Sequence, residues 1–243
     1  MTRIPKLIGL ILIGPFIFGY LAAIAPRFVT GRGSRGHFWR VTKRSCSILL
    51  WLLDVKTKMS PAAKAALAED ENSIIMVNHR SHLDGFTMMD TIPDEKWFTF
   101  AAKKELFQSG FLSRGFRHAG LVEIDRKNGS LALETLTDAI RNMPARRSVV
   151  LFAEGTRTGG ETLGDFKPGG VLAARATGRT IRPIVICGSD TLLPRDATLA
   201  KPGTIRLEVL PPFHCDPEAS VDDDLARLRL EMCKVFDGTT AGL

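Results

Sequence analysis

Hydrophobic and polar positions alternate in blocks along most of this chain, with short apolar runs separated by segments of helical spacing. The apolar runs have the length and β-branched content of strands, and they cover residues 73–77, 97–102, 121–124, 149–152, 181–187 and 204–210. Helical spacing covers residues 131–141 and 170–176, and Ser220 with Asp223 forms a capping box before a last helix that reaches Val235. This alternation predicts an α/β fold with a layered mixed, mostly parallel sheet flanked by helices.

The N-terminal part of the chain follows a different pattern. Residues 7–25 carry no charge, and as a helix they would be about 28 Å long, against a hydrocarbon core of about 30 Å. Pro15 weakens this helix, so a kinked membrane span and a helix lying in the interface are both open. A cleaved signal peptide ending at Ala25 is the rival, but Pro26 directly after it makes cleavage unfavourable.

Basic residues and a second apolar segment follow this run. Six arginines and lysines between residues 27 and 44 predict that the main body lies on the cytoplasmic face of the inner membrane. Residues 46–55 are too short to span a membrane and, with Trp51, suit a helix half-sunk in an anionic membrane face; a core helix is the alternative. We therefore expect an N-terminal hydrophobic membrane-docking helical region in residues 1–60 and a catalytic domain in residues 61–243.

Composition narrows the class of protein. The 243 residues are 44% hydrophobic, enough for one sizeable core, and the net charge of +7 favours anionic partners. The four cysteines lie far apart without a CxxC pair, which predicts free thiols in a reducing compartment. No Walker-type phosphate loop is present, which argues against a P-loop nucleotidase.

Polar residues concentrate directly after the apolar run 73–77. His79 and Asp84 are five residues apart and can meet only if the chain turns between them. Asp84 in the first turn of a following helix would bind one imidazole nitrogen and leave the other to act as a general base. Two other interpretations stay open, a capped turn with surface histidines and a metal site that includes His82.

Two further polar blocks also follow predicted strands. Arg126 stands just past the strand at residues 121–124, within a basic segment whose other interpretation is a solvated face. After residues 149–152 come a carboxylate, a glycine, a hydroxyl and a guanidinium, which suit close approach to a phosphate or a structural ion pair in a tight turn. These residues are Glu154, Gly155, Thr156 and Arg157. Pro183 interrupts a predicted strand, which suggests an edge or a bulge.

Four blocks in this order resemble the glycerolipid acyltransferase family, of the 1-acylglycerol-3-phosphate acyltransferase type. They are NHxxxxD (Asn78 to Asp84), GxxxIDR (Gly120 to Arg126), FxEGTR (Phe152 to Arg157) and the strand with Pro183. The resemblance covers about residues 60 to 215. Glu123 departs from it, because members often have an aromatic residue there, which bears on the lining of the substrate pocket.

The resemblance implies a reaction and a role for each residue. His79 would deprotonate the acceptor hydroxyl and Asp84 would orient His79. The phosphate and glycerol of the acceptor would be held by Arg126, Glu154, Gly155, Thr156 and Arg157. The family needs no metal and no cofactor; acyl-CoA or acyl-carrier protein is the donor, and a lysophospholipid in the membrane is the acceptor. The product would be phosphatidic acid, and no nucleic acid is involved.

Other functions remain open at this level. The "HRSH" at residues 79–82 also resembles the glycerol-3-phosphate acyltransferase form of the block, and another lysolipid such as lyso-ornithine lipid is a further acceptor. Outside the class, the protein could be a membrane-bound metal-dependent phosphoesterase or a non-catalytic basic membrane scaffold.

Overall fold

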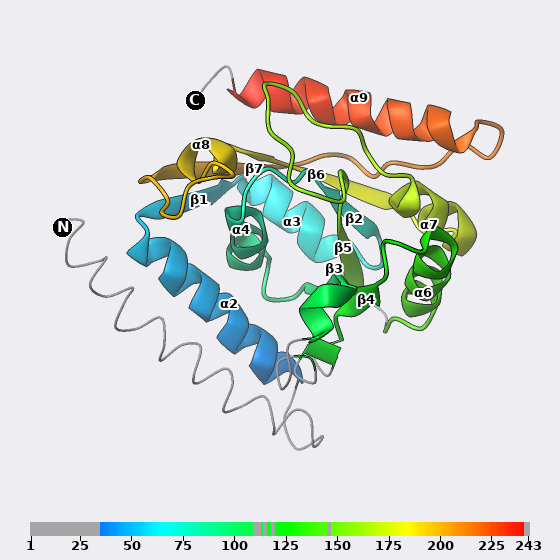
Figure 1. Cartoon of the computed structure of the whole chain (residues 1–243), viewed down its shortest axis with the longest axis horizontal. Coiled ribbons are helices and arrows are strands. Elements are labelled where there is room, and N and C mark those ends of the chain that lie inside the picture. The colour runs from blue at the N-terminus through cyan, green and yellow to red at the C-terminus, as the bar shows by residue number, and fades with distance from the viewer. Residues whose placement is uncertain (1–34, 109–112, 114–115, 118–119, 145–146, 241–243) are drawn as a thin grey trace.

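A seven-stranded sheet lies between helices on both of its faces (Figure 1). The computed structural model describes residues 35–108, 113, 116–117, 120–144 and 147–240. The strands are β1 (Val55–Met59), β2 (Ile74–Val77), β3 (Trp97–Lys103), β4 (Val122–Ile124), β5 (Arg147–Phe152), β6 (Ile181–Cys187) and β7 (Gly203–Val209). Their order across the sheet is β1-β7-β6-β2-β5-β3-β4.

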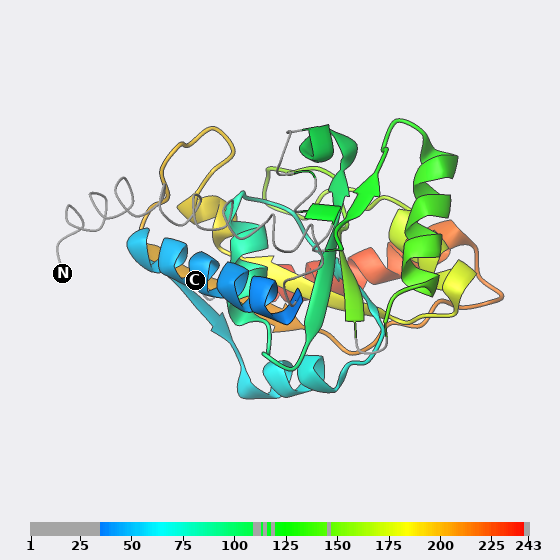
Figure 2. The same cartoon turned by 90° about the horizontal axis from the view of Figure 1, so that it is seen from below.

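The helices form one layer on each face of the sheet. They are α2 (Arg35–Leu52), α3 (Pro61–Glu69), α4 (Leu83–Thr91), the 3-10 helix η1 (Lys104–Gln108), α6 (Gly129–Arg141), α7 (Gly169–Thr177), α8 (Ser189–Leu192) and α9 (Val221–Thr240). α2 and α4 cover one face, and α6, α7 and α9 cover the other. Figure 2 shows α2 in front of the sheet and α9 behind it.

The central strand β2 supplies both hydrophobic cores, because successive side chains of a strand point to opposite faces. Ile74 and Met76 belong to the core beneath α6, α7 and α9, whereas Ile75 and Val77 belong to the core beneath α2 and α4. All four side chains are at most 1% exposed. A strand covered on both faces has no polar side, which is why this run is continuously apolar.

Strand directions confirm the predicted mixed, mostly parallel sheet. β2 to β6 run parallel to their neighbours among themselves, whereas β7 runs antiparallel to β6 and β1 runs parallel to β7. The carboxyl ends of the five parallel strands therefore meet at one edge of the sheet, where open α/β sheets bind their ligands.

Two elements at the start of the folded body were not predicted. β1 is an edge strand in which Val55 is buried and Lys56 is exposed, and lysines on an edge discourage pairing with other chains. α3 begins with Pro61 in its first turn, and the hydroxyl of Ser60 caps it by accepting the main-chain N–H of Ala63 at 3.1 Å.

Pro183 lies in β6, an interior strand, so the expected edge position is wrong and the expected bulge is confirmed. Between the Ile184–Val209 pair and the Ile181–Phe213 bridge, three residues of the returning chain stand opposite two residues of β6. The ladder is interrupted at this point, so the absent N–H of proline is tolerated there.

The segment expected to dock on a membrane is the last part of α2. Cys46 and Leu50 are 7% and 2% exposed and join the core that contains Ile75, whereas Trp51 is 52% exposed. The inner side of α2 therefore packs in the hydrophobic core, as the alternative interpretation expected. Because β1 pairs with β7, the predicted boundary at residue 60 falls inside the folded body.

The predicted membrane span lies outside the described part of the chain. Residues 7–25 are not among the described residues. Within residues 35–240, as far as the structure describes them, no helix combines the length and the apolar character needed to cross a bilayer.

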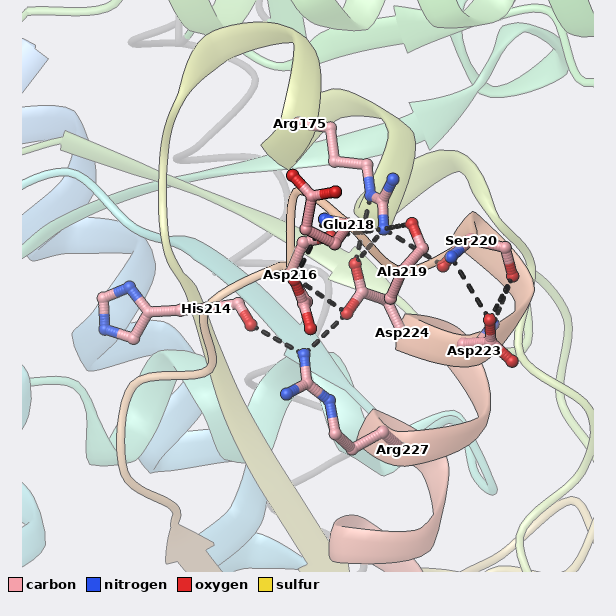
Figure 3. A network of polar contacts seen from close by, with 9 residues as sticks. All are labelled: Arg175, His214, Asp216, Glu218, Ala219, Ser220, Asp223, Asp224 and Arg227. Carbon is pink, nitrogen blue, oxygen red and sulfur yellow. Dashed lines mark hydrogen bonds and ion pairs between the residues drawn. The ribbon is translucent and has the colours of Figure 1, made fainter.

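A network of ion pairs fastens the end of α7 to the start of α9 (Figure 3). The buried carboxylate of Asp224 accepts hydrogen bonds from Arg175 Nε at 3.0 Å and Nη2 at 2.5 Å, and from Arg227 Nη2 at 2.6 Å. Arg175 also donates to the carbonyl oxygens of Asp216, Ala219 and Ser220. The predicted capping box is present beside it, since the N–H of Asp223 donates to Ser220 Oγ at 3.1 Å.

Candidate active site

The polar turn after β2 brings His79 and Asp84 together. His79 Nδ1 lies 2.8 Å from Asp84 Oδ2, because the chain reverses after β2 and Asp84 stands in the first turn of α4. This is the contact that the spacing of the two residues predicted. With Nδ1 bonded to the carboxylate, Nε2 is the ring nitrogen left to take up a proton.

Asp84 is fixed by main-chain donors as well as by the imidazole. Its side chain is 0% exposed, and the same oxygen, Oδ2, accepts the N–H of Arg80 at 2.7 Å and of Ser81 at 2.8 Å. Hydrogen bonds to a carboxylate are strong and directional. The oxygen that binds His79 therefore has a defined position.

Asn78 continues the pairing of β2 with β6 through its side chain. Asn78 Nδ2 donates to the carbonyl of Ile186 at 2.9 Å, and Oδ1 accepts the N–H of Ile186 at 2.7 Å. The amide thus takes the place of a peptide unit in the ladder. It sets where the strand ends and hence where His79 begins the turn.

Glu154, which follows β5, contacts the same turn. Its Oε2 accepts the main-chain N–H of His79 at 2.9 Å, and the residue is 1% exposed. Burial raises the pKa of this carboxyl to about 7, although hydrogen bonds from the main chain oppose the shift. The resemblance implied Glu154 as a substrate ligand; the structure places it against the turn that carries His79 and in the wall of the adjacent cavity.

A cavity of about 510 Å³ opens beside this turn, between the sheet and helices α6 and α7. Its apolar wall includes Met76, Ala101, Ile124, Ala132, Leu133, Leu136, Leu151 and Leu172. Phe152 also lines it and stacks on the imidazole of His79, with ring centroids 3.9 Å apart and planes at 19°. Phe152 is therefore shared by the ring contact of His79 and the lining of the cavity.

Three more of the predicted ligands line the same cavity, namely Arg126, Gly155 and Thr156. Arg126 Nη1 donates to the carbonyl of Gly155, which joins the second block to the third. Gly155 has a φ of +70° and lies so close to Lys167 that a Cβ would stand 3.2 Å from its Cγ. The structure therefore brings these blocks to one place.

Arg157 lies on the histidine side of the site. The pKa of His82 is lowered, chiefly by burial and then by the positive charge of Arg157, so the guanidinium acts electrostatically on this imidazole. Arg157 Nη1 is buried and has no hydrogen-bond partner among the residues that the structure describes. Such a guanidinium is ready to bind an oxygen of a ligand.

Sequence reasoning assigned no role to two residues that the structure brings to the site. Lys167 lines the cavity just before α7, and the sequence feature that could have found it is a lysine followed by a proline and a Gly-Gly helix start. Arg80 lies within the first block and is 3% exposed, which is rare for arginine. The sequence feature that could have drawn attention to Arg80 is its position beside His79.

The metal-site interpretation lacks a set of ligands in the described part of the chain. No group of three or more histidine, cysteine, aspartate or glutamate side chains is arranged there to hold a metal ion. His79, His82 and Asp84, which the sequence suggested as ligands, do not form such a group.

Comparisons with known proteins identify the family of this chain. The family model described as Acyltransferase matches residues 58–187. The 1-acyl-sn-glycerol-3-phosphate acyltransferase of Limnanthes alba is 26% identical over 170 residues, which are 70% of this chain and 58% of that protein. The enzyme of the same name from Helicobacter pylori is 28% identical over 182 residues, 73% of this chain and 74% of that protein.

A solved structure extends the likeness to the fold. The 1-acyl-sn-glycerophosphate (LPA) acyltransferase PlsC from Thermotoga maritima matches with a TM-score of 0.71 at 20% identity, covering 98% of both chains. The chain spans about half the length of several curated relatives that it matches. Because the family model covers more than half of the chain, the protein belongs to the acyltransferase family.

Proposed function

We propose that this protein transfers a fatty acyl group from an acyl thioester to the free hydroxyl of 1-acyl-glycerol-3-phosphate, giving phosphatidic acid in phospholipid biosynthesis. The observation that carries the proposal is the His79–Asp84 pair, whose imidazole stacks on Phe152, beside an apolar cavity that Phe152 also lines and that has cationic residues in its wall. Apolar walls suit an acyl chain, and the cations suit a phosphate. Relatives named for this reaction support the same conclusion.

The pair supplies general-base catalysis. His79 Nε2 takes the proton of the acceptor hydroxyl as its oxygen attacks the thioester carbonyl, and the buried carboxylate of Asp84 stabilises the imidazolium. Collapse of the tetrahedral intermediate forms the ester and expels the thiolate, which receives the proton from His79. The donor is acyl-CoA or acyl-carrier protein, and the step needs neither a metal nor a covalent acyl-enzyme.

The acceptor phosphate is recognised by cations beside the cavity. Arg126 and Lys167 lie in the cavity wall, and Arg157 presents a buried Nη1 without a partner among the described residues. Gly155 and Thr156 line the same cavity. An arginine can bind a phosphate through two parallel hydrogen bonds, so this set favours a phosphorylated acceptor over a zwitterionic lysolipid.

The membrane contact is part of the same proposal. Arg40, Lys43, Arg44 and Trp51 lie around one hollow on the outer side of α2. Cations beside an exposed tryptophan suit the anionic cytoplasmic face of the inner membrane, where the lysophospholipid resides.

The test is acyl transfer in detergent with a chelator present. Labelled acyl-CoA and acyl-carrier protein are offered with lysophosphatidic acid, glycerol 3-phosphate or lyso-ornithine lipid. We expect transfer to lysophosphatidic acid, loss of transfer in His79→Ala, and normal transfer in the control His214→Ala, whose ring is exposed near Cys215 on the α7–α9 side. If acyl transfer occurs only to one of the other acceptors, that acceptor is the substrate in place of lysophosphatidic acid. Acyl transfer by His79→Ala would refute the general-base mechanism.

A further inference from the structure

We propose that Arg80 is a positioning residue of this active site, whose buried guanidinium holds the His79–Asp84 turn in its reactive geometry. The inference rests on the proposed acyl transfer. Neither the predicted roles nor the resemblance of the four blocks assigns this side chain anything to do.

The guanidinium of Arg80 ties three separate segments together. Nε and Nη2 donate to Asp190 Oδ2 of α8 at 2.8 and 2.5 Å, and Nη1 donates to the carbonyl of Thr162 at 2.8 Å. Nη2 also donates to the carbonyl of Gly160, and the ring of Phe236 in α9 lies 5.1 Å from Cζ. With 3% of its surface exposed, the charge is satisfied inside the protein.

The main chain of the same residue holds the catalytic aspartate. The N–H of Arg80 and of Ser81 both donate to Asp84 Oδ2, the oxygen that binds His79. The loop that the guanidinium holds also returns to the turn, since the N–H of Thr158 donates to the carbonyl of His79 at 3.0 Å. Side chain and main chain of Arg80 thus fix the turn from two directions.

This arrangement predicts an effect on the chemical step. If the guanidinium is removed, the turn can shift and the N–H groups no longer aim at Asp84 Oδ2. A misplacement of about 1 Å near reacting groups can cost roughly 100-fold in rate. Because Arg80 is buried, substrate binding has little dependence on it, and the loss falls on kcat while KM stays close to its original value.

The chain contains a matched control in Arg175 (Figure 3). Its Nε and Nη2 also bind a single oxygen of one carboxylate, Asp224 Oδ2, and it donates to three main-chain carbonyls as well. Arg175 lies in the last turn of α7, which runs back against the parallel strands to the edge opposite the catalytic turn. Its loss should lower stability in a similar way without reaching His79.

The experiment compares Arg80→Gln and Arg175→Gln in the detergent assay, at a temperature where both are folded by circular dichroism. We expect both to lower Tm, and only Arg80→Gln to lower kcat, by between about 10-fold and 100-fold with KM changed less than about threefold. Equal kcat in the two variants, or a raised KM with normal kcat in Arg80→Gln, would overturn the inference.

Asp190→Asn provides a second test, which also serves if Arg80→Gln does not fold. Asp190 is 26% exposed and holds Arg80 from the far side of the turn, so we expect a smaller fall in kcat with KM unchanged. In the double variant the two effects should not add, because they remove one interaction. Wild-type kcat in Asp190→Asn contradicts the inference while the proposed function stands. If the folded wild-type protein shows no acyl transfer, both the inference and the proposed function are refuted.

Discussion

At the residue scale, Glu154 connects the polar block that follows β5 with the polar block that contains His79 and Asp84. Its carboxyl group binds the main chain of His79, and the two residues are 75 positions apart in the sequence. Burial raises its pKa to about 7, so its charge changes near neutral pH. The turn that carries His79 is therefore in contact with a carboxyl group whose ionisation changes with the pH of the solution near neutrality.

This shift predicts a pH-dependent stability. The folded-state pKa of Glu154 lies above its ordinary value of 4.5, so its contribution is fully present below pH 4.5 and is lost as pH rises through about 7. Glu154→Gln removes this loss while keeping an acceptor for the His79 N–H. Relative to wild type, the variant should gain on the order of 3 kcal/mol in the free energy of unfolding between pH 4.5 and 8.

Denaturant unfolding in steps of pH measures this difference. Glu134→Gln, on the exposed side of α6, is the control and should follow the wild type at every pH. A wild-type-minus-variant difference that stays constant from pH 4.5 to 8 would contradict the raised pKa.

At this site, contacts between residues close in the sequence could be predicted, whereas contacts between distant residues could not. The contact of His79 with Asp84 could be predicted because five residues of chain allow only a few geometries. The contact of Glu154 with His79 depends on β2 and β5 being neighbours in the sheet, which no local pattern states. The position of Arg80 beside His79 is visible in the sequence, but its side-chain partners are not. Asp190, for example, is 110 residues away.

At the scale of elements, α6 forms one wall of the cavity and α7 another. Ala132 and Leu133 of α6 line the cavity, whereas their neighbour Leu131 is 47% exposed. Gly170 of α7 lies so close to β2 that a Cβ there would stand 2.6 Å from Met76 Sδ. Two helices packed closely against the sheet thus set the width of an apolar space.

Under the proposed function, this wall selects the acyl chain. Ala132→Phe adds a ring inside the cavity, so long donors should lose at least about tenfold in kcat/KM relative to donors a few carbons shorter. Leu131→Phe, one residue away on the exposed side, is the matched control and should leave the ratio unchanged. Competition between acyl-CoA donors of two lengths measures the ratio, and an unaltered preference in Ala132→Phe would place the chain elsewhere.

Elements were predicted best where both faces are buried. The strand expected at residues 181–187 is β6 with the same bounds, and that at residues 149–152 lies within β5. β1 was missed because its lysines alternate with apolar residues in a short edge strand, a pattern that also suits an exposed segment. β1 is recognised as a strand by its pairing with β7, which is far away in the sequence and leaves no local pattern.

At the scale of the whole molecule, the residues from α2 to α9 share continuous cores. The predicted free thiols are confirmed for all four cysteines, of which Cys46 and Cys187 are buried and Cys215 and Cys233 are partly buried. Cys46 lies in α2 and Cys187 in β6, in the cores on opposite faces of the sheet. Burial raises the pKa of each of these two thiols to about 12.

These two thiols report whether α2 unfolds with the sheet. We expect Cys46 and Cys187 to resist alkylation in the native protein and to become reactive in the same denaturant transition, because α2 shares its core with β2. Pulsed alkylation followed by peptide mass spectrometry gives the two midpoints, with Cys215 and Cys233 as partly accessible references. Labelling of Cys46 at clearly lower denaturant than Cys187 would show that α2 detaches as a separate unit.

Strand direction reverses between β6 and β7, so β1 starts at the edge where the five parallel strands end. α2 leads directly into β1, and its final turn, with the exposed Trp51, therefore comes to the same edge as the turn that carries His79. A hydrophobic tail that leaves the bilayer at this tryptophan would have its headgroup on the reactive side of the sheet. Under the proposed function, the antiparallel pair would thus orient the protein so that a substrate from the bilayer need not travel around it to reach His79.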